Sequence, residues 1–115
     1  MLGICLGHQA IIENFGGKII NASEVRHGKV DTIKHLSNCF IFDSIDYEFN
    51  ATRYHSLVSD KKLPSCLEVI ATSKNDNEIM GVKHSKYKIF GLQFHPESIA
   101  TRGGKKMIEN FIRVI

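Results

Sequence analysis

The sequence has few cysteines and no long apolar run. Its 115 residues include three Cys, far apart and odd in number, which argues against a disulfide framework and leaves room for one functional thiol. No apolar stretch is long enough to span a bilayer, and the first residues lack the basic segment that opens a secretory signal. We therefore expect a cytoplasmic chain with no membrane partner.

Signals for nucleic acid, metal and nucleotide are missing too. Fifteen basic and twelve acidic residues give a net charge of +3, and the basic ones are scattered without interleaved aromatics, so we expect no nucleic-acid partner. The six His residues show neither i, i+4 pairs nor short Cys/His spacings, so we expect no metal. The two Gly-Gly-Lys runs lack the rest of a P-loop, and no cofactor is expected.

The composition is that of an ordinary globular protein, and the length allows one domain at most. Apolar spacing predicts a short strand over 1–4, a helix over 8–15 that Gly16 and Gly17 stop, and an amphipathic closing helix over 105–115. Between the helices, short apolar segments alternate with turn residues, which predicts strands, several of them antiparallel. The predicted strands are 18–20, 29–35, 40–42, 49–57, 67–73, 79–84 and 89–95, with a hairpin turn at 75–77.

The beginning of the chain is unusual. A strand that starts at residue 1 and becomes a helix by residue 6 leaves no earlier strands for the parallel sheet to which it would belong. We expect a segment upstream of Met1 to be missing.

Residues 3–7, Gly-Ile-Cys-Leu-Gly, place a nucleophile between two glycines at a strand-to-helix turn. Small neighbours permit the strained turn that exposes the Cys5 side chain. The helix N-terminus is expected to favour the thiolate, and the N–H of Leu6 is expected to point at a developing oxyanion. A structural Cys in a glycine-flanked turn is the alternative.

Residues 93–98, Gln-Phe-His-Pro-Glu-Ser, offer the groups that a Cys nucleophile needs. His95 can take and return a proton, and Glu97 can fix the imidazole tautomer. Pro96 biases His95 toward an extended conformation at the end of a strand. A surface His/Glu pair is the alternative for this motif alone, but together with Cys5 the pattern favours catalysis.

These two motifs resemble the signatures of class I glutamine amidotransferases. The resemblance implies an α/β fold with a flavodoxin-like doubly wound sheet, here without its N-terminal strands, with an antiparallel strand-rich middle and a C-terminal helix. Residues 1–115 would then be part of a glutamine amidotransferase domain. It also implies that Cys5 is the nucleophile, His95 its base and Glu97 the orienting carboxylate.

The same resemblance assigns substrate contacts and a missing loop. Gln9, Ser56 and Leu57 match positions that contact the bound L-glutamine. The family's domain begins well before the Cys turn, with strands and a loop that carries the second oxyanion donor. Loss of one such donor typically costs about a hundredfold to a thousandfold in rate, and unpaired sheet edges favour aggregation.

Segments 27–29, 52–57 and 79–84 are similar to the glutaminase subunits (component II) of anthranilate synthase and aminodeoxychorismate synthase. The resemblance implies hydrolysis of L-glutamine through a Cys thioester, with ammonia passed to a chorismate-binding synthase subunit (component I) in a heteromeric complex. We favour anthranilate synthase and tryptophan biosynthesis. The alternatives are aminodeoxychorismate synthase, in folate biosynthesis, and a non-catalytic truncated remnant.

Other polar residues and the remaining thiols have simpler interpretations. We assign 27–29 to the partner interface or the ammonia path, although for His27, Arg53 and His84 taken one by one a structural role is the favoured interpretation. Cys39 and Cys66 stand beside apolar residues and are expected in the core.

Overall fold

The computed structural model describes residues 1–36 and 39–114, with the side chains of 23–29, 55 and 56 excepted. In chain order the elements are β1 (Leu2–Ile4), α1 (Leu6–Asn14), β2 (Ile19–His35), the 3-10 turn η1 (Phe40–Phe42), β3 (Glu48–Ser59), β4 (Leu67–Ser73), β5 (Ile79–His84), β6 (Phe90–Leu92) and α2 (Gly104–Val114).

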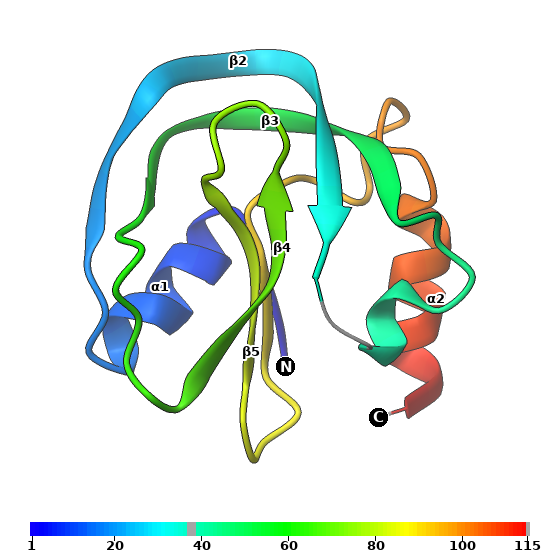
Figure 1. Ribbon diagram of the computed structural model, residues 1–115. Coiled ribbons are helices and arrows are strands. Elements are labelled where there is room, and N and C mark those ends of the chain that lie inside the picture. The colour runs from blue at the N-terminus through cyan, green and yellow to red at the C-terminus, as the bar shows by residue number, and fades with distance from the viewer. Residues whose placement is uncertain (37–38, 115) are drawn as a thin grey trace.

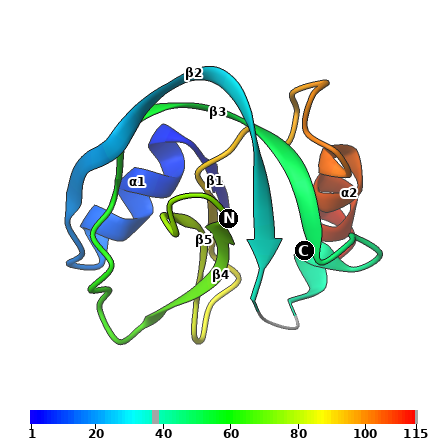
Figure 2. The same cartoon turned by 45° about the horizontal axis from the view of Figure 1, so that its top comes forward.

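The strands form one six-stranded mixed sheet in the order β1-β6-β5-β4-β2-β3. Among the described residues, β1 and β6 make the parallel pair, with Ile4 opposite Leu92, and the other neighbours are antiparallel. The long strands β2 and β3 arch together from the side of α1 to the side of α2 (Figures 1 and 2). The α/β fold expected from the sequence is confirmed.

Two apolar clusters hold the sheet and helices together. The larger one lies among η1, α2 and the arch formed by strands β2 and β3. There the ring of Phe49 is 5.9 Å from that of Phe42 and 5.5 Å from that of Phe94. The smaller one packs Ile11 and Ile12 of α1 against the β4–β5 side of the sheet. Burial of these side chains from water supplies the main stabilisation of both helices.

Several expected elements are confirmed and some differ. The closing helix and the β4–β5 hairpin are present, and Asn77 in that turn has a φ of 55°. The predicted strands at 18–20 and 29–35 are parts of one continuous strand, β2, whose pairing with β3 shifts register twice. The strand predicted at 89–95 is shorter, because β6 ends at Leu92.

The strand predicted at 40–42 is wrong, because these residues form η1. Ile41 and Phe42 are both buried, whereas a strand would point consecutive side chains to opposite faces. Asn110 of α2 donates from Nδ2 to the carbonyl oxygens of Ile41 (3.1 Å) and Asp43 (2.9 Å). The helix therefore satisfies carbonyl groups that a sheet partner would otherwise bond.

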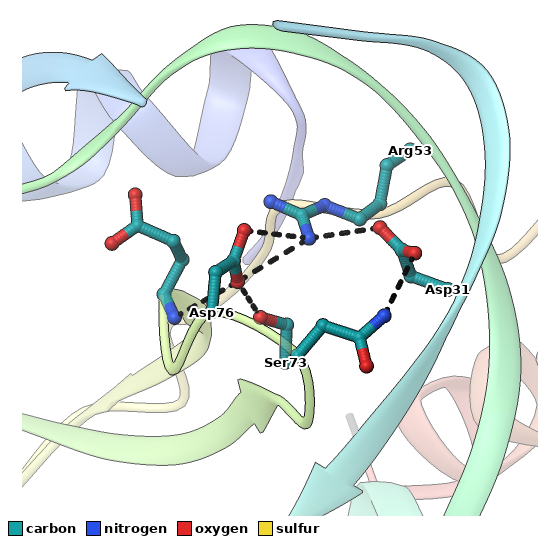
Figure 3. A network of polar contacts seen from close by, with 6 residues as sticks. Asp31, Arg53, Ser73 and Asp76 are labelled. Atoms are coloured by element: carbon teal, nitrogen blue, oxygen red, sulfur yellow. Dashed lines mark hydrogen bonds and ion pairs between the residues drawn. The ribbon is translucent and has the colours of Figure 1, made fainter. Parts of the chain in front are cut away.

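A buried ion-pair network joins the arch to the hairpin (Figure 3). Arg53 of β3 is fully buried, and its Nη1 lies 3.0 Å from Asp31 Oδ2 and 3.3 Å from Asp76 Oδ2. Asn75 donates to Asp31 at 3.4 Å, and the Ser73 hydroxyl donates to Asp76. These contacts support a structural role for Arg53.

His84 also has structural contacts. Its Nδ1 accepts from the N–H groups of Lys86 (3.0 Å) and Tyr87 (3.2 Å), which closes the turn after β5. Its ring packs 4.9 Å from the rings of Phe15 and Tyr87.

Candidate active site

Cys5 occupies a strained turn between β1 and α1. Its φ of 55° and ψ of −103° lie in a region of backbone angles that residues other than glycine rarely adopt. A Cβ on Gly3 would come within 2.6 Å of the Gly7 backbone and 2.7 Å of Ile11, so the close approach of β1 to α1 requires glycine at position 3. A Cβ on Gly7 would meet nothing within 4 Å, so the expected need for a small residue is confirmed only at position 3.

Sheet pairing brings the two sequence motifs together. Because β1 and β6 are parallel neighbours, Cys5 and Gln93 both follow carboxyl ends of strands at the same edge of the sheet. The N–H of Cys5 donates to the carbonyl of Leu92 at 2.8 Å, and Gln93 Nε2 lies 3.8 Å from Cys5 Sγ. Residues 88 positions apart therefore touch.

His95 lies two residues beyond Gln93 and is held from several sides. Its Nδ1 is 2.7 Å from Glu97 Oε2, and its N–H donates to the carbonyl of Thr52 at 3.3 Å. The Tyr54 ring meets the imidazole edge to face with centroids 5.3 Å apart, while the Tyr54 carbonyl accepts from Cys5 Sγ at 3.8 Å. Tyr54 therefore contacts both Cys5 and His95.

The loop after His95 is fastened to β3 by hydroxyl groups. Thr101 donates from Oγ1 to the carbonyl of His95 at 2.6 Å and accepts from the N–H of Thr52 at 3.1 Å. The Ser98 hydroxyl donates to the Thr52 hydroxyl at 3.1 Å. Because His95 follows the short strand β6, these contacts replace the hydrogen-bond ladder that a longer strand would supply.

The protonation of Cys5 differs from the expectation that the helix N-terminus favours a thiolate. Burial raises the pKa of the Cys5 thiol, the hydrogen bond from the Leu6 backbone lowers it, and the charge of Glu97 raises it further. Burial has the larger effect, so the net shift is upward and the thiol is protonated at neutral pH. The Leu6 backbone hydrogen bond is directed at the sulfur, and its expected role toward an oxyanion stays a prediction.

The three residues expected to contact glutamine lie on two elements: Gln9 on α1, and Ser56 and Leu57 on β3. Gln9 Nε2 donates to the carbonyl of Leu57 and to Gln93 Oε1, both at 3.2 Å. Gln9 and Leu57 are thus joined beside Cys5, and Gln9 keeps its Oε1 for other contacts. The side chain of Ser56 lies outside the described residues.

The structure also places the remaining predicted residues. Cys39 is buried in the larger apolar cluster, which confirms the expectation of a core position, whereas Cys66 is only half-buried against the smaller cluster. The backbone of His27 pairs with Tyr54 in the β2–β3 ladder, and that of Lys29 pairs with Arg53. The side chains of 27–29 lie outside the described residues, so their interface role stays a prediction.

Sequence reasoning assigned no role to Gln93, Tyr54 or Thr101. A signal for Gln93 was available, since it follows an apolar strand and stands two residues before His95. Tyr54 reaches His95 through a tertiary contact that no local pattern encodes, and Thr101 lies in the loop after His95 and also bonds the distant Thr52.

Within 1–36 and 39–114, no group of three His, Cys, Asp or Glu side chains is arranged to hold a metal ion. Neither described helix is long and apolar enough to cross a membrane.

The chain is similar to curated proteins that are considerably longer. It is 49% identical over 114 residues to anthranilate synthase component 2 of Saccharolobus solfataricus, covering 97% of this chain and 58% of that protein. It is 47% identical over 113 residues to the aminodeoxychorismate/anthranilate synthase component 2 of Bacillus subtilis, covering 97% and 57%. The chain thus spans a little over half the length of these relatives.

Solved structures and a family model give the fold and the family of the chain. A candidate GMP synthase protein from Thermoplasma acidophilum superposes with a TM-score of 0.90 at 28% identity, over 98% of this chain and 55% of that one. A glutamine amidotransferase from Thermotoga maritima has the same fold, with a TM-score of 0.73 over 98% of this chain and 45% of that one, at 24% identity. The model for glutamine amidotransferase class-I matches residues 1–115, so the chain belongs to the class I glutamine amidotransferase family.

Proposed function

We propose that this chain is the catalytic part of a glutaminase component of anthranilate synthase. It would hydrolyse L-glutamine and supply ammonia to a chorismate-using synthase subunit, in tryptophan biosynthesis. The observation that carries the proposal is the strained Cys5 turn beside the strand end that leads to the His95–Glu97 pair. Curated relatives named component 2 of this synthase support the choice of substrate and partner.

The first half of the reaction forms a thioester. His95 takes the Sγ proton of Cys5, since Glu97 occupies Nδ1 and leaves Nε2 as the proton acceptor. The sulfur attacks the side-chain carbonyl carbon of glutamine, and the carbonyl electrons move to oxygen, where the Leu6 N–H stabilises the charge. The carbonyl reforms as the C–N bond breaks, and His95 returns its proton to the leaving nitrogen, which departs as ammonia.

The second half releases glutamate. His95 takes a proton from a water molecule that attacks the γ-glutamyl thioester, and the Cys5 sulfur leaves and regains a proton from His95. The raised pKa of the Cys5 thiol fits a cycle in which His95 removes the proton during attack, rather than one that starts from a permanent thiolate.

Aminodeoxychorismate synthase is the second candidate for the partner. The Bacillus subtilis relative carries both names, and it is as similar to this chain as several relatives named for anthranilate synthase alone. The alternative of a non-catalytic remnant and the cytoplasmic location stay predictions from the sequence.

Ammonia release tests the proposal. The purified chain is assayed with L-glutamine, with and without a chorismate-using synthase subunit, beside its Cys5→Ser variant. We expect release that Cys5→Ser abolishes. Ammonia no higher than in the variant under both conditions would reject glutaminase activity and favour the remnant. Co-purification with each synthase subunit, followed by product analysis from chorismate, separates the two partners.

A further inference from the structure

A chain of carboxamide contacts runs from β3 to the Cys5 sulfur. It starts at the carbonyl of Leu57, which accepts from Gln9 Nε2 at 3.2 Å. The same Nε2 donates to Gln93 Oε1 at 3.2 Å, and Gln93 Nε2 donates to Cys5 Sγ at 3.8 Å. Gln9 and Gln93 are both buried, with Gln93 fully so, and the contact between the two carboxamides is therefore shielded from water, whereas the contacts with Leu57 and with half-buried Cys5 are shielded in part.

The contacts have a fixed direction. A backbone carbonyl can only accept, so the Leu57 oxygen requires the amino group of Gln9 to face it. The two N–H bonds of that amino group are directed at Leu57 and Gln93, which requires the oxygen of Gln93 to face Gln9. The amino group of Gln93 must then face Cys5. Reversing either carboxamide would set two acceptors, or two donors, against each other.

An N–H donor at the sulfur matters because of what surrounds it. Burial and the negative charge of Glu97 both disfavour a charged sulfur at Cys5. A hydrogen bond to an ionised acceptor is stronger than one to its neutral form, so the Gln93 contact strengthens when the thiol loses its proton. The Tyr54 carbonyl accepts from the sulfur on another side and cannot supply this stabilisation.

We propose that Gln93 is an additional catalytic residue that stabilises the Cys5 thiolate formed when His95 takes the proton, and that Gln9 is a positioning residue that holds the Gln93 carboxamide in the required orientation. The inference rests on the proposed role of Cys5 as nucleophile. It gives Gln9 a function in the free protein, separate from any contact with glutamine.

Alkylation of Cys5 by iodoacetamide measures this effect without glutamine. Its rate is followed against pH in the full chain, with Cys5 resolved from Cys39 and Cys66 by peptide mass spectrometry. We expect Gln93→Leu to slow alkylation at neutral pH about tenfold and to move the profile to higher pH, since one hydrogen bond to a charged group is lost. Gln9→Leu, which does not touch the sulfur, is expected to move the profile in the same direction by less.

The double variant tests whether the two residues act in series. If Gln9 acts through Gln93, Gln9→Leu adds nothing once Gln93 is Leu. Asn110→Leu is the matched control, because it also replaces a buried carboxamide that is hydrogen-bonded to groups on other elements, but on α2 and away from Cys5. Its Cys5 profile should equal that of the unchanged chain.

Two results would overturn the inference. The first is an alkylation profile for Gln93→Leu that matches Asn110→Leu, and the second is a Gln9→Leu effect that adds in full to that of Gln93→Leu. If Gln93→Leu does not fold, an unshifted profile for Gln9→Leu counts against the inference and a shifted one supports it. An alkylation shift in a chain that releases no ammonia would show that the contact is right and the proposed reaction is wrong.

Discussion

The ring of Tyr54 meets the imidazole of His95 edge to face, with 5.3 Å between centroids and 86° between planes. Tyr54 belongs to β3, and His95 follows β6, which three strands separate from β3 in the sheet order. The arch formed by β2 and β3 therefore brings Tyr54 over the end of β6. The same residue accepts a hydrogen bond from Cys5 through its carbonyl. The arch is thus part of the candidate site.

Replacing Tyr54 by Leu should lower kcat about twofold to tenfold, because an aromatic pair contributes about 0.5–1.5 kcal/mol beyond its buried area. Tyr54→Phe keeps the ring and should stay near the unchanged rate. Steady-state glutaminase kinetics check both variants. Equal loss in Phe and Leu would assign the effect to the hydroxyl and contradict the ring contact.

Thr101→Val should lower the free energy of unfolding by about 1–3 kcal/mol. The substitution leaves the carbonyl of His95 and the buried N–H of Thr52 without the hydroxyl that pairs with both. Urea denaturation measures the loss, and Thr101→Ser, which keeps the hydroxyl, serves as the control. A Val variant as stable as the unchanged chain would show that these hydrogen bonds do not secure the loop.

Arg53→Met should cost about 3–5 kcal/mol of unfolding free energy, since it leaves the carboxylates of Asp31 and Asp76 without their buried cation. Lys74→Met breaks the exposed pair with Glu48 and should cost about 1 kcal/mol or less. Denaturation curves of the two variants test the contrast. Similar losses in both would argue against a special role for the network in Figure 3.

Stability should fall as pH rises past the ordinary pKa of a thiol. Burial raises the pKa of Cys39 and Cys5 in the folded chain, so the unfolded chain releases these protons first and is favoured at high pH. Urea denaturation at neutral and alkaline pH compares the chain with a Cys5→Ala/Cys39→Ala variant. The variant should lose less stability between the two pH values, and an equal loss would contradict the direction of the shifts.

Local sequence patterns predicted the elements that depend on interactions between residues close in the sequence. The closing helix follows from apolar spacing that puts Met107 and Phe111 on one face, and the hairpin follows from turn residues at 75–77. The Cys5 turn and the His95–Glu97 pair are also encoded within a few residues. The strand predicted at 40–42 failed because the partner of the Ile41 carbonyl is the side chain of Asn110 on α2, which is distant in the sequence, and not a neighbouring strand.

Features of the site that depend on pairing between distant strands escaped prediction. The contact of Gln93 with Cys5 arises from the parallel register of β1 and β6, and that of Tyr54 from the arch. The expected effect of the helix N-terminus on Cys5 was reversed by burial, which depends on the whole fold. Sequence alone indicated the candidate reacting groups but not their environment.

Glutamine hydrolysis by the proposed route requires a thioester between Cys5 and the γ-carbonyl of glutamine. The most direct measurement is rapid acid quenching of the chain with L-glutamine, followed by mass spectrometry of the Cys5 peptide in the unchanged chain and in Cys5→Ala. We expect one γ-glutamyl group on the Cys5 peptide and no ammonia from Cys5→Ala. Ammonia release that persists in Cys5→Ala, or a γ-glutamyl group found on Cys39 or Cys66 instead, would contradict the proposed role of Cys5.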